Sequence, residues 1–197
     1  MTVDETPVSP VLVARMAAAS TPVATLRALP LASVISVRAR GNGMARVASV
    51  LGLDALPGHG AVARSSQGRV CWVRPDEWLV QGDSAAHAES SAALLAALAT
   101  AVGDGTPDAE GAVVELSASR YRLALSGPGT RDVLAAVCAL DLHPRVFPVG
   151  HGTQTLLGKA PVLLQLVDDA PTWELLVRPS FVAYVVDWLT DAMTGAS

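Results

Sequence analysis

Residues that often carry chemistry are spread along this chain without a spacing typical of an active site. The histidines show no close metal-ligand spacing. They are His59, His87, His143 and His151. Neither cysteine, Cys71 or Cys138, has a cysteine or histidine partner nearby in the sequence. We expect structural or solvent-facing roles for these side chains and predict no metal site.

Acidic residues offer one candidate pair for general acid–base catalysis, Asp76 and Glu77. Neighbouring residues of a strand point to opposite faces, so these two carboxylates are not expected to act on one substrate. Asp76 is better explained as closing the turn that Pro75 begins. No GxGxxG opens a helix after a strand, and no GxxxxGKS or GxxxxGKT loop is present. We predict neither catalytic nor cofactor-binding residues.

Composition excludes some partners and compartments. With 14 Lys+Arg and a formal net charge of -4, the chain lacks the clustered cations that nucleic-acid binding requires. Its apolar stretches are shorter than the roughly 20 residues of a membrane span, and its first residues do not resemble a signal peptide. We therefore expect a cytoplasmic protein that binds neither nucleic acid nor membrane. The mean hydropathy of +0.40 reflects either an alanine-rich genome or apolar surface covered by other subunits.

The elements that position these residues follow a mixed pattern. Ile35, Val37 and Ala39 alternate with polar residues, which is typical of a half-buried strand. Further strands are predicted near residues 60–64, 68–73, 77–82, 113–116, 121–126, 153–158, 161–167 and 173–178, and helices near 44–51, 84–101, 130–137 and 181–192. We predict an N-terminal arm (1–30), a first α+β lobe (31–103), a linker (104–111) and a second α+β lobe (112–197).

The two predicted lobes look like copies of one another. Gly41 and Gly127 begin matching GNG and GPG turns, 86 positions apart. At the same offset the strand around Ile35 falls on the strand around Tyr121. Each lobe then has the order strand, helix, three strands, helix, with the helices packed on mostly antiparallel sheets. The alternative is a chance likeness within a chain rich in alanine, valine and leucine.

Four longer strings are distinctive: WVRPDEWLV (72–80), LSGPGTRDVLAAVCALDLHPRVFPVG (125–150), TQTLLGKAPVLL (153–164) and WELLVRPSFVAYVVDWL (173–189). Together they resemble the gamma subunit of heterotetrameric sarcosine oxidase. The resemblance runs in order from about Leu31 to the C-terminus. It implies a fold similar to the folate-binding domain of aminomethyltransferases, which suits a two-lobed repeat.

What the resemblance implies for function is a small, non-catalytic, structural subunit of a bacterial oxidoreductase. The enzyme oxidatively demethylates sarcosine with O2 to glycine and H2O2, and yields 5,10-methylenetetrahydrofolate. Its FAD, FMN and NAD are held by the larger alpha and beta subunits, with tetrahydrofolate as the one-carbon acceptor. The expected partners are the alpha, beta and delta subunits, with most contact to alpha.

Five residues within the matching strings are candidates for subunit contact. They are Trp78, Asp141, His143, Arg145 and Arg178. Trp78 is expected to anchor either the core between the lobes or a subunit contact. Asp141, His143 and Arg145 are expected either to fix their own loop by hydrogen bonds or to contact the alpha subunit or a channel wall. The same alternatives apply to Arg178, before the last helix.

Two other functions remain open from the sequence. One is a free-standing tetrahydrofolate-binding protein similar to aminomethyltransferases, although neither a pterin-binding acidic residue nor a catalytic aspartate is evident. The other is a scaffold subunit of a related N-methyl amino acid oxidase. The sequence of a small subunit does not specify which N-methyl amine the complex oxidises.

Overall fold

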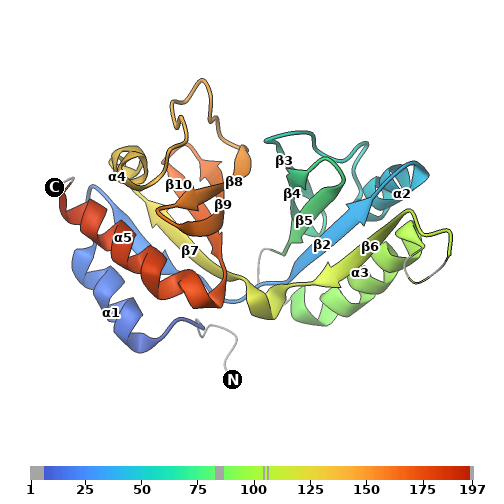
Figure 1. Cartoon of the computed structure of the whole chain (residues 1–197), viewed down its shortest axis with the longest axis horizontal. Coiled ribbons are helices and arrows are strands. Elements are labelled where there is room, and N and C mark those ends of the chain that lie inside the picture. The colour runs from blue at the N-terminus through green and yellow to red at the C-terminus, as the bar shows by residue number, and fades with distance from the viewer. Residues whose placement is uncertain (1–6, 83–86, 104, 106, 196–197) are drawn as a thin grey trace. The chain divides into compact units, whose positions relative to one another are not determined.

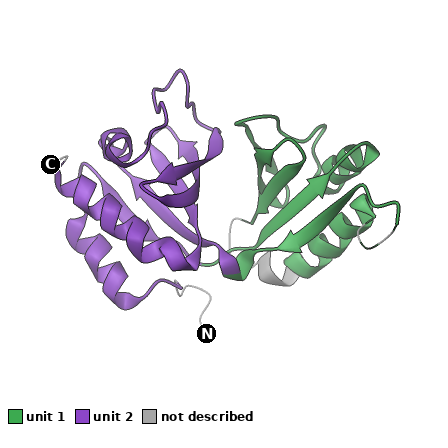
Figure 2. Ribbon diagram, viewed as in Figure 1, with its two compact units in different colours: residues 1–4, 31–118 green, residues 5–30, 119–197 purple. Residues whose placement is uncertain are grey.

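The computed structural model describes residues 7–82, 87–103, 105 and 107–195, and side chains in the third helix from residue 91 onward. This part of the chain divides into two compact units (Figure 2). Of the described residues, unit 1 contains Leu31–Ala118, and unit 2 combines residues 7–30 with residues 119–195. Each unit has its own five-stranded antiparallel sheet with helices on one face (Figure 1).

Unit 1 forms a sheet in the order β3-β4-β5-β2-β6. Its strands are β2 (Val34–Ala39), β3 (Val62–Ser65), β4 (Gly68–Arg74), β5 (Glu77–Gln81) and β6 (Gly111–Glu115), and its helices are α2 (Asn42–Leu51) and α3 (His87–Val102). The predicted strand is found at β2, and Ile35, Val37 and Ala39 enter the core of this unit, but its burial does not alternate as predicted, because Val34 and Ser36 are buried too. The side chains between them, such as Arg38, lie on the sheet face away from the helices.

Unit 2 forms a sheet in the order β1-β7-β10-β9-β8. Its strands are β1 (Thr25–Ala28), β7 (Tyr121–Ser126), β8 (Gly152–Leu157), β9 (Ala160–Asp168) and β10 (Thr172–Val177), and its helices are α1 (Pro10–Ala19), α4 (Thr130–Val137) and α5 (Val182–Gly195). Short 3-10 turns, η1 (Ser117–Ser119) and η2 (Pro179–Phe181), precede β7 and α5. Trp173 is the largest fully buried side chain of its core, and its indole nitrogen donates to Thr130 Oγ1 at 3.2 Å.

The predicted internal repeat agrees with the order of elements in both units. After β2 or β7 comes a helix, then a three-stranded meander, then a second helix. Both strand-to-helix turns use glycine with positive φ, +50° at Gly41 and +123° at Gly127. A side chain at either position would be strained, which explains why both repeats place glycine there. The predicted α+β fold of helices on antiparallel sheets is confirmed.

Two strands divide the chain differently from the boundaries that the sequence suggests. Strand β1, within the predicted arm, pairs with β7 from Thr25 opposite Ser126 to Ala28 opposite Leu123. Strand β6, within the predicted second lobe, pairs instead with β2. The two strands occupy equivalent places, since each lies at the edge of its sheet beside the first strand of a repeat. Strand β1 precedes the first repeat along the chain but completes the sheet of the second. Strand β6 precedes the second repeat but completes the sheet of the first.

No helix within the described residues is both long and apolar enough to cross a lipid bilayer.

Candidate interaction site

Trp78 belongs to the core of unit 1. It is 2% exposed, and its indole nitrogen donates a hydrogen bond to the Pro57 carbonyl oxygen at 2.8 Å. Within the core it packs with the apolar side chains of β2, α2 and α3. This packing supports a core role within one unit, and the enclosed ring does not offer a surface for another subunit.

The loop between α4 and β8 holds three of the five predicted contact residues, and it is fixed by its own hydrogen bonds. Asp141 Oδ1 accepts from the His143 backbone nitrogen at 2.9 Å, and His143 Nδ1 accepts from the Arg145 backbone nitrogen at 3.2 Å. The side chains of all three residues lie in exposed positions. Asp141 and His143 thus make hydrogen bonds of the kind that the loop-fixing alternative expects, and contact of these residues with the alpha subunit stays a prediction.

Two apolar residues anchor this loop to unit 2. Leu142 and Phe147 are buried, and the Phe147 ring lies 5.1 Å from the Trp173 ring. Arg131 reinforces the anchor, because it donates to the Leu142 carbonyl and its guanidinium carbon lies 5.1 Å from the centre of the Trp173 ring. Such cation–π geometry is favourable within about 6 Å. The loop is therefore anchored to the core of the unit at Leu142 and Phe147.

Between the anchors the same loop presents apolar side chains outward. Val146 is 53% exposed and Val149 is 49% exposed. Exposed polar side chains, including Arg145, lie beside them. A fixed loop with apolar residues in a polar rim has the composition of a protein contact surface. We call residues 141–149 the contact loop.

Arg178 is placed elsewhere, at the start of the 3-10 turn η2. Its backbone carbonyl accepts from the Phe181 nitrogen at 2.9 Å, and its side chain is exposed. It precedes helix α5, as the sequence indicated. The structure therefore groups Asp141, His143 and Arg145 in one loop, assigns Trp78 to a core and places Arg178 at a helix entrance.

One polar cluster in unit 1 was not singled out from the sequence. Arg38 and Arg40 both donate to Asp76 Oδ2, whereas Glu77 accepts from Ser36 Oγ at 2.9 Å. Hydrogen bonds from Arg40 and Arg38 hold the pKa of Asp76 below its ordinary value. The two neighbouring carboxylates therefore have separate partners.

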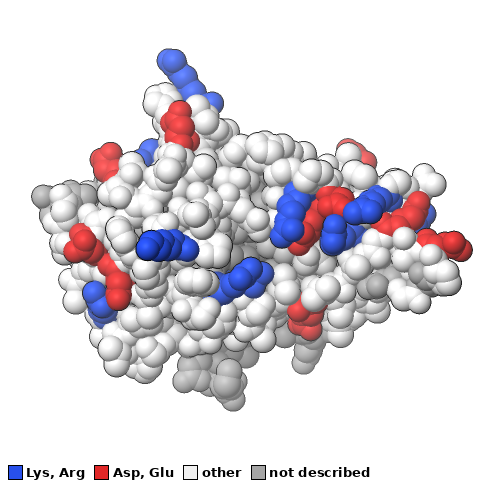
Figure 3. Space-filling view, viewed as in Figure 1, with Lys and Arg blue, Asp and Glu red and all other residues white. Residues whose placement is uncertain are grey.

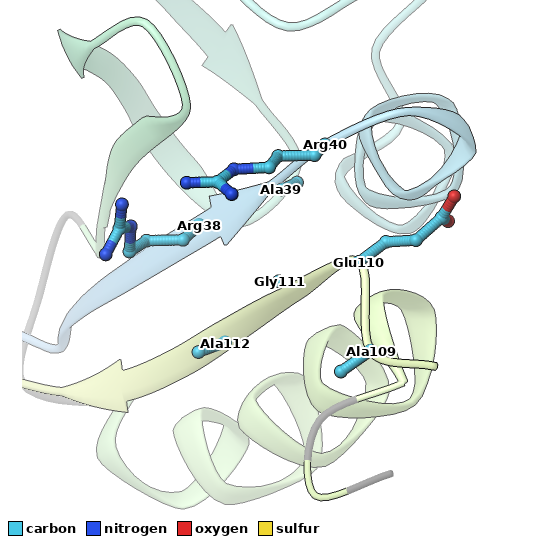
Figure 4. Close-up of a pocket in the computed structure, with 7 residues that line it drawn as sticks. All are labelled: Arg38, Ala39, Arg40, Ala109, Glu110, Gly111 and Ala112. Carbon is cyan, nitrogen blue, oxygen red and sulfur yellow. The ribbon is translucent and has the colours of Figure 1, made fainter. Parts of the chain in front are cut away.

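A pocket opens beside this cluster (Figure 4). Its volume is about 240 Å³, and it is lined by Arg38, Ala39, Arg40, Ala109, Glu110, Gly111 and Ala112. Pockets for cofactors and drug-sized ligands are usually about 300–1,000 Å³. Glu110 points away from the two arginines towards α2, where its Oε1 accepts from the Asn42 nitrogen at 3.2 Å. The dimensions and lining do not fit a flavin or a dinucleotide.

The remaining reactive groups have structural environments. Burial raises the pKa of the Cys71 thiol to about 12, so the nucleophilic thiolate is disfavoured. The Cys138 sulfur contacts Thr155 Oγ1 at 3.5 Å. Arg122 and Glu174 form an ion pair at 3.0 Å that is largely buried between β7 and β10. Across the described ranges, no group of three or more histidine, cysteine, aspartate or glutamate side chains is arranged to hold a metal ion.

In the sequence, the LDLHPR string indicated the contact loop. No pattern in the sequence indicated a role for Arg38 or Arg40. Arg38 fitted the polar positions of an alternating strand, and Arg40 followed it in the same pattern. Their convergence depends on the β2–β5 pairing, which brings Arg38 opposite Glu77 and thereby beside the turn that holds Asp76. Residues 36 or more positions apart in the chain are joined here only by the register of the sheet.

Comparisons with known proteins agree on one family. The family model described as "Sarcosine oxidase, gamma subunit family" matches residues 38–195. The sarcosine oxidase subunit gamma of Corynebacterium sp. (strain P-1) is 40% identical over 172 residues, covering 86% of this chain and 79% of the relative. The corresponding subunit of Corynebacterium sp. (strain U-96) is 37% identical over 176 residues, covering 88% and 80%.

Solved structures add a comparison of folds. The heterotetrameric sarcosine oxidase from Corynebacterium sp. U-96, in complex with pyrrole 2-carboxylate, includes a chain with a TM-score of 0.81 and 36% identity, covering 94% of this chain and 93% of that one. The glycine cleavage system aminomethyltransferase T from Bartonella henselae gives a TM-score of 0.64 at 17% identity, covering 90% and 48%, and this likeness concerns the fold alone. On the extent of the family match and the identity to its named members, the chain belongs to the sarcosine oxidase gamma subunit family.

Proposed function

We propose that this chain is the non-catalytic gamma subunit of a heterotetrameric sarcosine oxidase and that it serves assembly of the complex. The observation that carries the proposal is the match to gamma subunits over most of both chains, including one from a solved heterotetramer. By this family relationship, the complex oxidises sarcosine with O2 to glycine and H2O2 and yields 5,10-methylenetetrahydrofolate. We place the complex in the cytoplasm, with alpha, beta and delta subunits as partners.

The cofactors FAD, FMN and NAD belong, in this proposal, to the larger subunits. Two features of the chain support that division of labour. The pocket beside Arg38 and Arg40 is too small for these groups, and burial keeps the Cys71 thiol protonated. In this proposal the partners carry out the oxidation, and this subunit contributes surface.

The contact loop supports an assembly role by its anchoring and its exposed valines. A partner that covers Val146 and Val149 removes apolar surface from water without having to order the loop first, which favours binding. Arg145 beside them suits the rim of such an interface. We propose that the contact loop packs against the alpha subunit.

The test is co-expression of all four subunits with a tagged gamma chain carrying Val146→Asp and Val149→Asp. Buried unpaired carboxylates are costly, so we expect recovery of the larger flavin-bearing subunits to fall by about tenfold or more. Sarcosine-dependent oxygen uptake of the eluate should fall in parallel. The matched control is Val11→Asp with Val13→Asp on helix α1, which places the same changes on another exposed surface.

Two results would contradict the proposal at different levels. If the contact-loop variant assembles as well as the control, the loop is not an interface, although the subunit assignment stands. If the unaltered chain purifies alone from cells that contain its partners, the family relationship reflects ancestry without assembly. A purified chain that is yellow and oxidises sarcosine by itself would overturn the non-catalytic role.

A further inference from the structure

Two arginine side chains converge on one carboxylate at the surface of unit 1. Arg38 Nη2 donates to Asp76 Oδ2 at 3.0 Å, and Arg40 donates to the same oxygen from Nε at 3.0 Å and from Nη2 at 2.7 Å. Residues two apart in an extended chain share a face, and both guanidinium groups extend to the same side in Figure 4. With Glu77 opposite Arg38 and paired with Arg74, three guanidinium groups face two carboxylates, which leaves the cluster with one excess positive charge.

The excess charge is on the outside of the cluster. The side chains of Arg38 and Arg40 are 53% and 72% exposed, whereas that of Asp76 is 23% exposed. The chain as a whole carries a net charge of -4, so an exposed cationic site runs against its overall charge. Figure 3 shows Lys and Arg atoms gathered with Asp and Glu atoms on unit 1, while most of this face of the molecule carries no charge.

The fold does not require these arginines. In the second repeat the equivalent positions, 86 residues further along, are Ala124 and Ser126. Strand β7 pairs with β10 in the same antiparallel manner as β2 pairs with β5. A sheet of this kind therefore forms without a guanidinium at either position, although unit 2 has its own ion pair, Arg122 with Glu174, across β7 and β10.

The surroundings of the arginines suit a bound chain segment. The pocket of about 240 Å³ lies beside them, with Gly111 and Ala112 in its wall. Ala112 is opposite Arg38 in the β2–β6 pairing, and Val114, two residues further along this edge strand, is 54% exposed. The acidic residue of the pocket wall, Glu110, is already bound to the start of α2 and to Arg46. An apolar strip thus continues directly from a cationic site.

We propose that Arg38 and Arg40 bind a carboxylate side chain in an acidic segment of a partner subunit, with apolar residues of that segment covering Val114. Guanidinium groups hold carboxylates through charge-assisted, often bidentate, hydrogen bonds. This inference deepens the proposed function, since it depends on the chain being a subunit of a complex. It locates a second contact on unit 1, separate from the contact loop of unit 2.

A tethered carboxylate fits this site better than a free small anion. Exposed ion pairs in water are weak and are screened by salt, so two open arginines alone hold a small anion poorly. A segment that also covers Val114 gains from apolar burial and excludes water from the ion pair. The edge position of β6 leaves room for such a segment along the strand.

The experiment measures binding of the full-length chain to an immobilised complex of the alpha, beta and delta subunits. We expect Arg38→Ala with Arg40→Ala to weaken binding about tenfold at about 50 mM salt, with a smaller difference at about 300 mM salt, where charges are screened. The control removes the same two charges from unit 2 by Arg27→Ala and Lys159→Ala, both exposed. Circular dichroism of each free variant verifies folding.

A third variant changes Asp76 in place of the arginines and should not weaken binding. Asp76→Asn removes the internal competitor and leaves both arginines, so binding should be as tight as in the parent chain or tighter. Binding of the double arginine variant that equals the parent would overturn the inference while leaving the proposed function intact. Failure of the parent chain to bind would overturn both. If Asp76→Asn is as harmful as the double variant, the positive charge is not what the partner recognises, and the inference is wrong.

Discussion

Tryptophan shows how one residue type takes two roles in this chain. Trp78 is buried in the core of unit 1 and donates to the Pro57 carbonyl, while Trp188 on helix α5 is 42% exposed. We expect Trp78→Ala to lower the free energy of unfolding of unit 1 by about 3–5 kcal/mol, through lost burial and a cavity. Trp188→Ala should cost below about 1 kcal/mol. Urea unfolding followed by hydrogen exchange in β2 and β5 would measure both, and equal costs would contradict the assignment of Trp78 to the core.

The thiol of Cys71 gives a prediction about pH. Its pKa is raised to about 12 in the folded chain from the ordinary value of 9.0, because burial disfavours the thiolate. Stability from the neutral thiol is therefore fully present below about pH 9 and is lost as pH rises towards 12. In a Cys138→Ala background, we expect Cys71 to resist a maleimide reagent at pH 8 until urea unfolds the chain. Rapid labelling of the folded protein, measured by mass spectrometry, would contradict this environment.

At the scale of elements, most strands were predictable, including the edge strands β3, β6 and β8, whereas the four-residue edge strand β1 was not. The pattern of Ile35, Val37 and Ala39 identified β2 because one face of that strand meets helices and the other does not. Strand β1 has only four residues, of which Leu26 alone is fully buried, so it gave almost no periodic signal. Pairing partners of edge strands depend on contacts distant in sequence, which local patterns do not contain.

The candidate contact residues also divide into those that the local sequence located and those that it did not. The contact loop follows a helix in a distinctive string, and its position after α4 was predictable from that string. The anchoring of Phe147 on Trp173 and the convergence of Arg38 and Arg40 on Asp76 were not, because each joins separate elements. Local sequence thus located the loop, whereas the register of a sheet was needed to find the arginine site.

For the whole molecule, the division of the chain into units makes a prediction about fragments. Unit 1 includes all five strands of its sheet within residues 31–118, but unit 2 needs β1 from before residue 31. Without β1, strand β7 loses its pairing from Thr25 to Ala28, and the core loses Leu26 and Met16. We therefore expect a fragment of residues 31–118 to keep its sheet and a fragment of 119–197 to remain poorly ordered. Amide NMR spectra of the two fragments would show the difference.

Adding a peptide of residues 5–30 should then restore ordered β7 and β10 amides to the 119–197 fragment. The restoring force is apolar burial together with the β1–β7 hydrogen bonds, so a peptide with Leu26→Ala should bind more weakly by roughly 2–4 kcal/mol. Arg27→Ala in the same strand is the matched control, because that side chain is exposed and its loss should change binding by less than about 0.5 kcal/mol. If the 119–197 fragment folds stably alone, β1 is a peripheral addition and the two repeats do not depend on equivalent edge strands. If the peptide restores order with the expected dependence on Leu26, the segment of residues 7–30 is a structural part of the second repeat.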